Sequence, residues 1–246
     1  MTRFEFWKEW KKKTRLEKEA IRSIKTAKKI ILSEIPREQI VSIYVKGSFI
    51  RREMNKKSDV DILIILRRSR FLNKLKRLEE EYREKCKPSI QFAGYSIWEL
   101  KRNMATNNGK AFRLNPSRTV QHLECYKLLY GKKLRKKDFC SGHPKVHFEG
   151  MIYAFKKIFI PKYKRREFGF SEVIKQVFWL TENEQLWKGK NPPYHWRKLA
   201  KSIKDKNHII YDALRFRVNP TKDKKKRANF IKKLEKHLAN LEDLLK

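Results

Sequence analysis

Along the first third of the chain, the apolar positions switch between helical and strand periodicity. From residue 15 to 33 they recur at helical spacing, behind a T-x-x-E capping box formed by Thr14 and Glu17. This pattern predicts a helix that ends before the next proline. Residues 40–45 and 60–66 are β-rich runs, and the second is apolar on both faces. A strand of that kind is typical of the centre of a sheet.

Beyond residue 66 the pattern predicts a polar helix, a third strand, a short helix, a loop and a last apolar segment. In that order they cover residues 71–85, 89–93, 97–104, 107–110 and 125–129. The apolar segment ends at a Tyr-Gly pair, where glycine is typical of a turn.

The composition changes between residues 132 and 145, where Lys, Arg, Gly and Pro replace the alternating apolar pattern. After this stretch only helical periodicity remains, in segments separated by Pro192-Pro193 and Asn219-Pro220. We therefore expect two domains, 1–138 and 139–246, of which the second is an all-α helical bundle.

The charge of the chain is strongly unbalanced. Its 246 residues include 63 Lys and Arg but 27 Asp and Glu, which gives a formal net charge of +36. Hydrophobic residues make up 40% of the chain, too many for a disordered basic tail. A folded protein of this charge attracts polyanions such as nucleic acid, nucleotides or an anionic membrane.

Cysteine usage and hydropathy indicate the compartment. Three scattered cysteines do not make a secreted disulfide scaffold, so a reducing cytoplasm is expected. No apolar run approaches the ~20 residues of a membrane helix. The first residues also lack an apolar signal core. We expect a cytoplasmic protein with no membrane partner.

One segment combines residues that carry chemistry. Gly47-Ser48 is followed, after ten residues, by Asp59-x-Asp61. At average residue frequencies this skeleton arises by chance in roughly one chain of this length in several hundred. A predicted strand precedes the Gly-Ser pair, and a second predicted strand carries the aspartates. This context makes the motif more specific than its residue frequencies alone.

The residue types of this segment suit a nucleotide and a metal ion. Alternation along a strand places Asp59 and Asp61 on one face, where two carboxylates repel unless a cation joins them. Hard oxygen ligands suit Mg²⁺. Gly47 lets backbone amides approach a phosphate, Ser48 adds a hydroxyl, and Arg51 can brace a phosphate or the loop. The alternative is that the segment forms only a tight bend followed by a solvated turn.

The segment resembles the signature of the polymerase-beta-like nucleotidyltransferase superfamily, especially its minimal and kanamycin-type members. The resemblance covers about the first 135 residues. It implies an α/β (α+β) domain with a mixed sheet flanked by helices, followed here by the all-α bundle. Tyr130-Gly131-Lys132 is similar to the segment that often closes such a domain.

The resemblance also implies roles for single residues and a cofactor. Mg²⁺, or Mn²⁺, would act with an NTP as substrate. The implied catalytic and metal-binding residues are Asp59 and Asp61. The implied nucleotide-binding residues are Gly47, Ser48, Arg51 and Ser58.

One position departs from the pattern of active members, which usually bring a third carboxylate from the next core strand. Gln91 stands at the position expected for it. A neutral amide coordinates weakly and does not act as a general base. Glu84 or Glu99 could replace it if the strand register differs. The loss of catalysis through Gln91 therefore stays open.

The second half resembles the helical bundles fused to such enzymes or partnered with them, including HEPN-type domains. RNases of that type carry an Arg and a His separated by four to six residues. Here Arg118 and His122 are separated by three residues, and Arg135 and His143 by seven. A ribonuclease is therefore not expected, and acceptor binding is the better role.

Weaker signals have ordinary alternatives. Cys140, His143 and His147 have a spacing that could suit zinc, but a fourth ligand is missing. His195, His208 and His237 are expected at the surface or at helix caps. Basic clusters with aromatic neighbours could bind unpaired bases, or the aromatics could pack inward. These clusters are Lys11 to Lys13, Lys162 to Arg166 and Lys224 to Arg227.

Two functions follow. The first is a Mg²⁺-dependent nucleotidyltransferase that moves NMP, in the first place AMP, from an NTP to a hydroxyl acceptor. The charge favours RNA or a nucleic-acid-associated protein as acceptor over a cationic drug. A homo-oligomer or a toxin-like partner is also compatible with the resemblance. The second is a degenerate nucleotidyltransferase fold that binds nucleotide or RNA without turnover.

Overall fold

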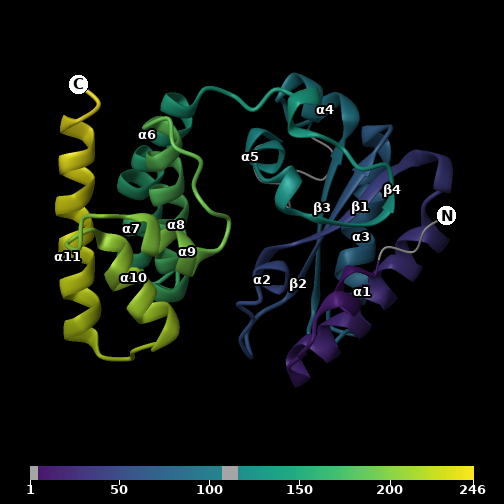
Figure 1. Cartoon of the computed structure of the whole chain (residues 1–246), viewed down its shortest axis with the longest axis horizontal. Coiled ribbons are helices and arrows are strands. Elements are labelled where there is room, and N and C mark those ends of the chain that lie inside the picture. Colours follow the sequence, from purple (N-terminus) through teal and green to yellow (C-terminus); the bar gives the residue numbers. More distant parts are fainter. Residues whose placement is uncertain (1–4, 107–115) are drawn as a thin grey trace. The chain divides into compact units, whose positions relative to one another are not determined.

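A computed structural model describes residues 5–106 and 116–246 of the chain. The chain divides into two units, Met1–Ser141 and Gly142–Lys246 (Figure 1). The predicted loop at 107–110 lies outside the described residues. No described helix is long and apolar enough to cross a membrane.

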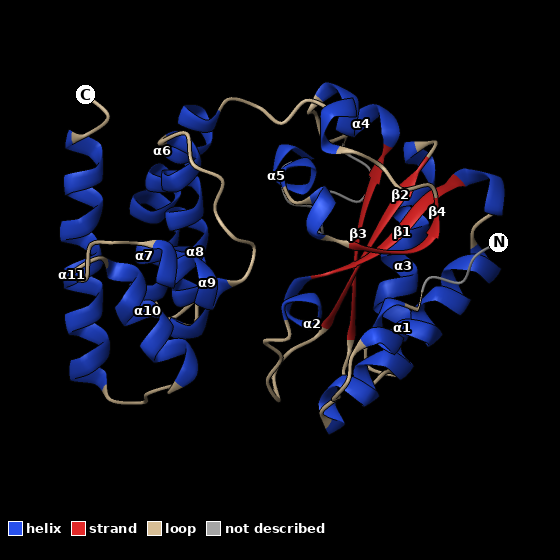
Figure 2. Cartoon of the chain, in the orientation of Figure 1, coloured by secondary structure: helices blue, strands red, loops and turns tan. Residues whose placement is uncertain are grey.

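The amino-terminal unit is built on a mixed sheet (Figure 2). The order of its strands is β3-β2-β1-β4. β2 pairs with β1 in antiparallel and with β3 in parallel orientation, and β4 pairs with β1 in antiparallel orientation. The strands are β1 (Ile40–Lys46), β2 (Val60–Leu66), β3 (Ile90–Ser96) and β4 (Lys127–Gly131). The predicted fold class, a mixed sheet with helices followed by a helical region, is confirmed.

The central position of β2 follows from its sequence. Ile62 to Leu66 are completely buried, as expected of a strand that is apolar on both faces. A parallel neighbour requires a crossover, and α3 (Leu72–Tyr82) provides it between β2 and β3. A Cβ atom at Gly94 of β3 would lie within 3 Å of Leu72 and Leu75. The glycine thus lets α3 pack closely on the sheet.

The first helix, α1 (Arg15–Glu34), matches its prediction closely. The Glu17 amide donates to Thr14 Oγ1 at 3.2 Å, and the Thr14 amide donates to the Glu17 carboxylate at 2.8 Å. The predicted capping box is therefore present. The apolar stripe of α1 is buried, including Ala20, Ile24 and Ile31.

Shorter helices complete the unit. They are α2 (Gly47–Arg51), α4 (Ile97–Arg102) and α5 (Pro116–Gln121). 3-10 turns cover Phe6–Glu9, Arg37–Gln39, Ser69–Phe71, Leu123–Cys125 and Lys136–Asp138. The helices expected at 71–85 and 97–104 are shorter than predicted, and the strand expected at 89–93 extends to Ser96.

The carboxy-terminal unit is helical in all its regular elements. They are α6 (Pro144–Ala154), a π-helical segment (Phe155–Phe159), α7 (Ile160–Lys164), α8 (Phe170–Trp187), α9 (Trp196–Ser202), α10 (Ile209–Val218) and α11 (Lys224–Asp243). Pro161 has no amide hydrogen to donate. The π-helical turn ends two residues before Pro161, and a π-helical turn changes the hydrogen-bond spacing of a helix.

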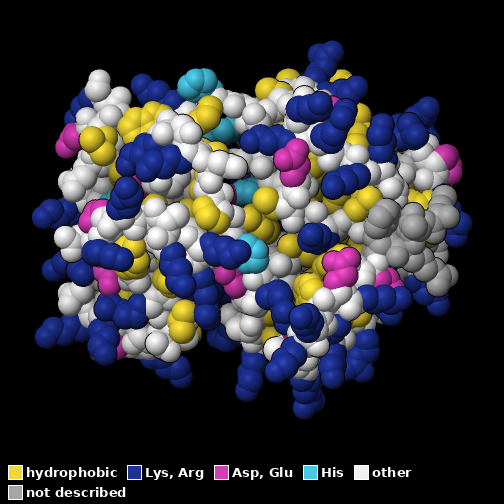
Figure 3. Space-filling model, viewed as in Figure 1, with side chains coloured by type: hydrophobic (Ala, Val, Ile, Leu, Met, Phe, Trp, Pro, Cys, Tyr) yellow, Lys and Arg dark blue, Asp and Glu magenta, His cyan; other side chains and the backbone are white. Residues whose placement is uncertain are grey.

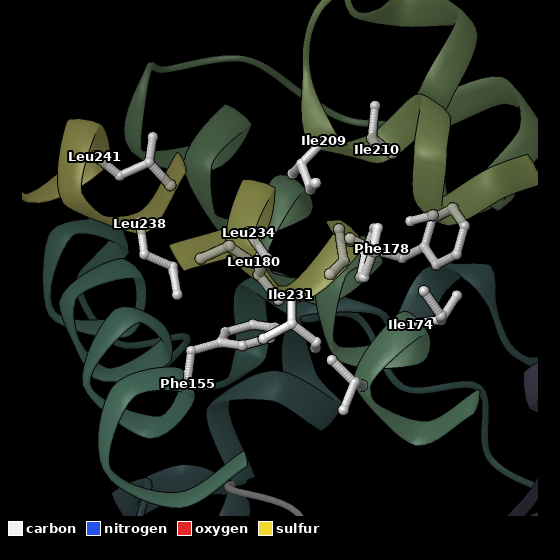
Figure 4. Close-up of a cluster of buried hydrophobic side chains, with 14 of the residues drawn as sticks. Phe155, Ile174, Phe178, Leu180, Ile209, Ile210, Ile231, Leu234, Leu238 and Leu241 are labelled. Carbon is white, nitrogen blue, oxygen red and sulfur yellow. The ribbon is translucent and has the colours of Figure 1, made fainter. Parts of the chain in front are cut away.

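A single apolar cluster holds this unit together. Side chains from α8, α10 and α11 converge in it, among them Phe178, Ile210 and Leu234 (Figure 4). The Trp196 ring stacks on Phe178 with 4.6 Å between centroids. The apolar positions of the sequence pattern thus form the core.

Candidate active site

The Gly-Ser pair lies at the turn between β1 and α2. Gly47 has a φ of +75°, in the left-handed region that favours glycine. A Cβ atom at this position would overlap Asp61 Oδ2 and would lie 2.8 Å from its Cγ atom. Ser48 follows and is 8% exposed. The close approach of Gly47 to Asp61 brings the two halves of the motif together.

Asp61 lies in a row of residues that crosses three strands. It is paired in the sheet with Lys46 of β1 and with Gln91 of β3. Paired residues on neighbouring strands share a face of the sheet. Lys46 Nζ lies 3.6 Å from Asp61 Oδ1, and the side chains are 15% and 20% exposed. Asp59 comes one residue before β2 begins.

This donor set fits a divalent cation. Asp59 and Asp61 offer hard carboxylate oxygens at the start of a buried strand. In this structure the Lys46 ammonium lies beside Asp61, so the carboxylate already has one positively charged partner. Asp59 and Asp61 are therefore the residues that would hold the ion.

The structure addresses the question of the third carboxylate. Gln91 is in register with Asp61, as the sequence predicts for that position. The Glu84 side chain is 86% exposed and lies 3.7 Å from Arg83. Glu99 is fully buried at the opposite end of β3, where it forms a capping box with Ser96. Neither glutamate lies in the row that contains Asp61.

Glu79 is a buried acid that the sequence analysis missed. It is 1% exposed on the face of α3 that packs against β3, and neither carboxylate oxygen has a hydrogen-bond partner among the described residues. Burial raises the pKa of Glu79, and the charge of Asp59 adds to the shift, while the charge of Arg83 opposes it. The sequence signal was an acid at position 79, on the apolar side of α3.

Arg51 and Ser58 shape the loop between α2 and β2. Arg51 is 9% exposed, and its Nε donates to Glu53 at 3.0 Å. Ser58 Oγ accepts from the Asn55 amide at 2.9 Å. In this conformation both side chains brace the loop that separates the Gly-Ser pair from the aspartates. Their contacts with a nucleotide stay a prediction.

The amino-terminal aromatics pack on α2. Trp7 is 5% exposed, and the Trp10 ring lies 5.0 Å from Phe49 of α2. Arg52 stacks on Trp10 at 4.7 Å and binds Glu17 at 2.9 Å. Burial alone would raise the pKa of Glu17, but the Arg52 hydrogen bond and the capping hydrogen bonds lower it. Trp7 therefore packs inward, whereas Trp10 is half-buried between Phe49 and Arg52.

In the carboxy-terminal unit, the described residues bring three potential metal ligands together, Glu184, His208 and His237. Glu184 is 3% exposed, accepts from Lys188 at 2.5 Å and lies 2.9 Å from His208 Nε2. His208 Nδ1 accepts from the Ile210 amide at 3.1 Å, so His208 caps α10 as predicted. A metal on Nε2 would place the ring proton on Nδ1 and break this cap. The cluster is therefore better suited to joining α8, α10 and α11 than to binding a metal ion.

The spacing of Cys140, His143 and His147 does not give a metal site. Their ligand atoms do not gather among the described residues. His143 instead caps α6, where its Nδ1 accepts from the Lys145 amide at 3.3 Å.

Comparison with protein families gives one match, which lies in the first unit. The model of a family described as nucleotidyltransferase domain matches residues 24–107. No curated protein matches the chain. Among solved structures, the chain is similar to spectinomycin adenyltransferase AAD(9) from Enterococcus faecialis, determined with ATP and spectinomycin, at 13% identity and a TM-score of 0.48. That likeness covers 87% of this chain and 99% of the other.

Proposed function

Because residues 24–107 match the model of a nucleotidyltransferase-domain family, we propose which residues carry a nucleotidyl transfer and what accepts the nucleotide. We propose that it transfers NMP, in the first place AMP, from an NTP to a hydroxyl group of RNA or of a protein bound to nucleic acid. The carrying observation is the close approach of Gly47 to Asp61, which joins both halves of the motif.

The proposed roles follow from position and chemistry. Ser48 and the backbone at Gly47 bind the triphosphate beside the Asp61 carboxylate. Asp59 and Asp61 would hold Mg²⁺ or Mn²⁺, which supplies charge neutralisation for the triphosphate. Arg51 and Ser58 fix the loop around the nucleotide. The acceptor oxygen forms a bond to the α-phosphorus, and the bond from that phosphorus to the oxygen that bridges to the β-phosphate breaks. Pyrophosphate leaves, and the hydroxyl proton is released to water.

Charge supports a nucleic-acid acceptor. Lys and Arg exceed Asp and Glu by 36, and their side chains predominate on the face shown in Figure 3. Most of the predicted basic clusters are solvent-facing, including Lys224 to Lys226 at the start of α11. Such a surface attracts RNA through its phosphates. The helical unit is the proposed place of acceptor binding.

A second function is favoured by Gln91. With Gln91 in register with Asp61, and with Glu84 and Glu99 elsewhere, the described strands carry no acid besides Asp61 that could act as a general base. The second candidate is therefore a domain that binds nucleotide or RNA without turnover.

Incubation with each radiolabelled NTP and Mg²⁺, alone and with total RNA, tests the proposal. We expect the wild type to label RNA or protein and Asp59→Ala/Asp61→Ala to label neither. Glu84→Ala is the matched control because it removes an exposed acid, and it should label like the wild type. Metal-dependent NTP binding without transfer to any acceptor would instead establish the second function.

A further inference from the structure

The row Lys46-Asp61-Gln91 has an unusual charge pattern for a metal site. Its three residues are neighbours across β1, β2 and β3, and they carry a positive, a negative and a neutral side chain. Two carboxylates, Asp59 and Asp61, are offset here by one fixed ammonium. The row therefore has less negative charge with which to attract cations than its aspartates alone suggest.

Lys46 is held in this row by its surroundings. Its side chain is 15% exposed, and its ammonium lies 3.6 Å from Asp61 Oδ1. The other oxygen of Asp61, Oδ2, lies against the backbone of Gly47. Lys46 thus lies beside one oxygen of the Asp61 carboxylate, and the turn at Gly47 lies beside the other. A second divalent ion on Asp61 would have to displace Lys46 or lie close to its positive charge.

Resting on the proposed function, we infer that Lys46 takes the place of a second metal ion. The domain binds one divalent cation with its nucleotide, and the Lys46 ammonium supplies the remaining positive charge beside the triphosphate. Its position fits this role because Lys46 directly precedes Gly47 and Ser48. An ammonium is a compact point charge that serves phosphate in this way in other nucleotide sites.

Counting bound Mn²⁺ tests this inference without relying on activity. Mn²⁺ is titrated by electron paramagnetic resonance in the presence of a non-hydrolysable NTP analogue. We expect one ion per wild-type chain and two in Lys46→Met/Gln91→Glu, which removes the ammonium and adds a carboxylate. Two ions on the wild type, or one on the double variant, would overturn the inference.

Nucleotide affinity gives a second readout. Lys46→Met should weaken binding of the analogue at least tenfold, and Lys46→Arg should restore most of it. Lys101→Met is the matched control because Lys101 is exposed on α4, beyond the opposite end of β3. An equal effect of Lys46→Met and Lys101→Met, in variants with unchanged circular dichroism, would overturn the inference.

Asp61→Asn separates this inference from the proposed function. If the wild type binds Mn²⁺ and nucleotide and Asp61→Asn does not, the proposed site stands, and the ion count alone decides the role of Lys46. If Asp61→Asn binds both like the wild type, the proposed site itself is wrong, and the role of Lys46 is overturned with it.

Discussion

Two carboxylates of this protein lie beside a lysine, and their surroundings differ. In the amino-terminal unit, Asp61 is 3.6 Å from Lys46, and the two side chains are 20% and 15% exposed. In the carboxy-terminal unit, Glu184 is 2.5 Å from Lys188 and is 3% exposed. Glu184 has a second partner in His208, whereas Asp61 abuts a glycine turn.

These surroundings indicate that Glu184 stabilises the fold, whereas Asp61 remains accessible to a ligand. Burial alone would raise the pKa of Glu184, but hydrogen bonds from His208 and Lys188 lower it to about 2. That balance joins α8 to the start of α10, because His208 also caps α10. The single ion pair of Asp61 is longer and partly open, so a metal ion or a nucleotide can still reach it.

The largest change is expected when the closed network is broken. Glu184→Gln removes the charge that His208 and Lys188 share, and we expect the free energy of unfolding to fall by about 3 kcal/mol. Urea unfolding measures the loss. Glu172→Gln is the control on the same helix, since the Glu172–Lys175 pair is more exposed and should contribute less than about 1 kcal/mol. Equal losses in the two variants would show that the buried network contributes no more to the free energy of unfolding than an exposed ion pair does.

A pH dependence follows from His237, whose ring lies 4.6 Å from that of His208. Burial lowers the pKa of His237 from 6.5 to about 4. Between these values the unfolded chain binds the proton and the folded chain does not, so stability falls as the pH falls. We expect about 3 kcal/mol to be lost over this range.

Denaturant unfolding at a series of pH values checks this expectation. His237→Leu should flatten the dependence between pH 6.5 and 4, while the contribution of Glu184 is lost only as the pH falls further, from about 4.5 toward 2. His143→Asn alters an exposed histidine but keeps a capping side chain, so it should leave the slope unchanged. A slope that survives in His237→Leu contradicts this assignment.

A smaller change is expected at the open site. Gly47→Ala forces a left-handed residue, which costs about 1–2 kcal/mol, and its Cβ would also displace Asp61. Gly189→Ala is a close control, because Gly189 has a φ of +71° and nothing lies within 4 Å of its added Cβ. Gly47→Ala should therefore unfold at a lower temperature and bind nucleotide more weakly than Gly189→Ala, because only its Cβ meets Asp61. If both lose the same stability and neither loses nucleotide binding, the contact has no role.

The sequence predicted the elements whose signals are local. The capping box of α1 and the doubly apolar β2 needed no distant information, and both appear in the structure. The register that aligns Gln91 with Asp61 was also expected, because β3 is a short run with one polar position at that end.

What escaped prediction depends on contacts between distant residues. Glu79 became a buried acid only because α3 packs on β3, and Lys46 became the partner of Asp61 only through the pairing of β1 with β2. The Glu184 network joins three helices that are far apart in sequence. No local pattern announces such partners, although an acid on an apolar helix face was a usable sign for Glu79.

The most direct test measures transfer of label from an NTP at equal concentrations of folded wild type, Asp61→Asn and Glu184→Gln. We predict that Asp61→Asn loses transfer by at least about a thousandfold while keeping its stability within about 1 kcal/mol of the wild type. Glu184→Gln should transfer at the wild-type rate per folded molecule. Full transfer by Asp61→Asn, or loss of transfer in folded Glu184→Gln alone, would contradict the assignment of chemistry to the first carboxylate and structure to the second.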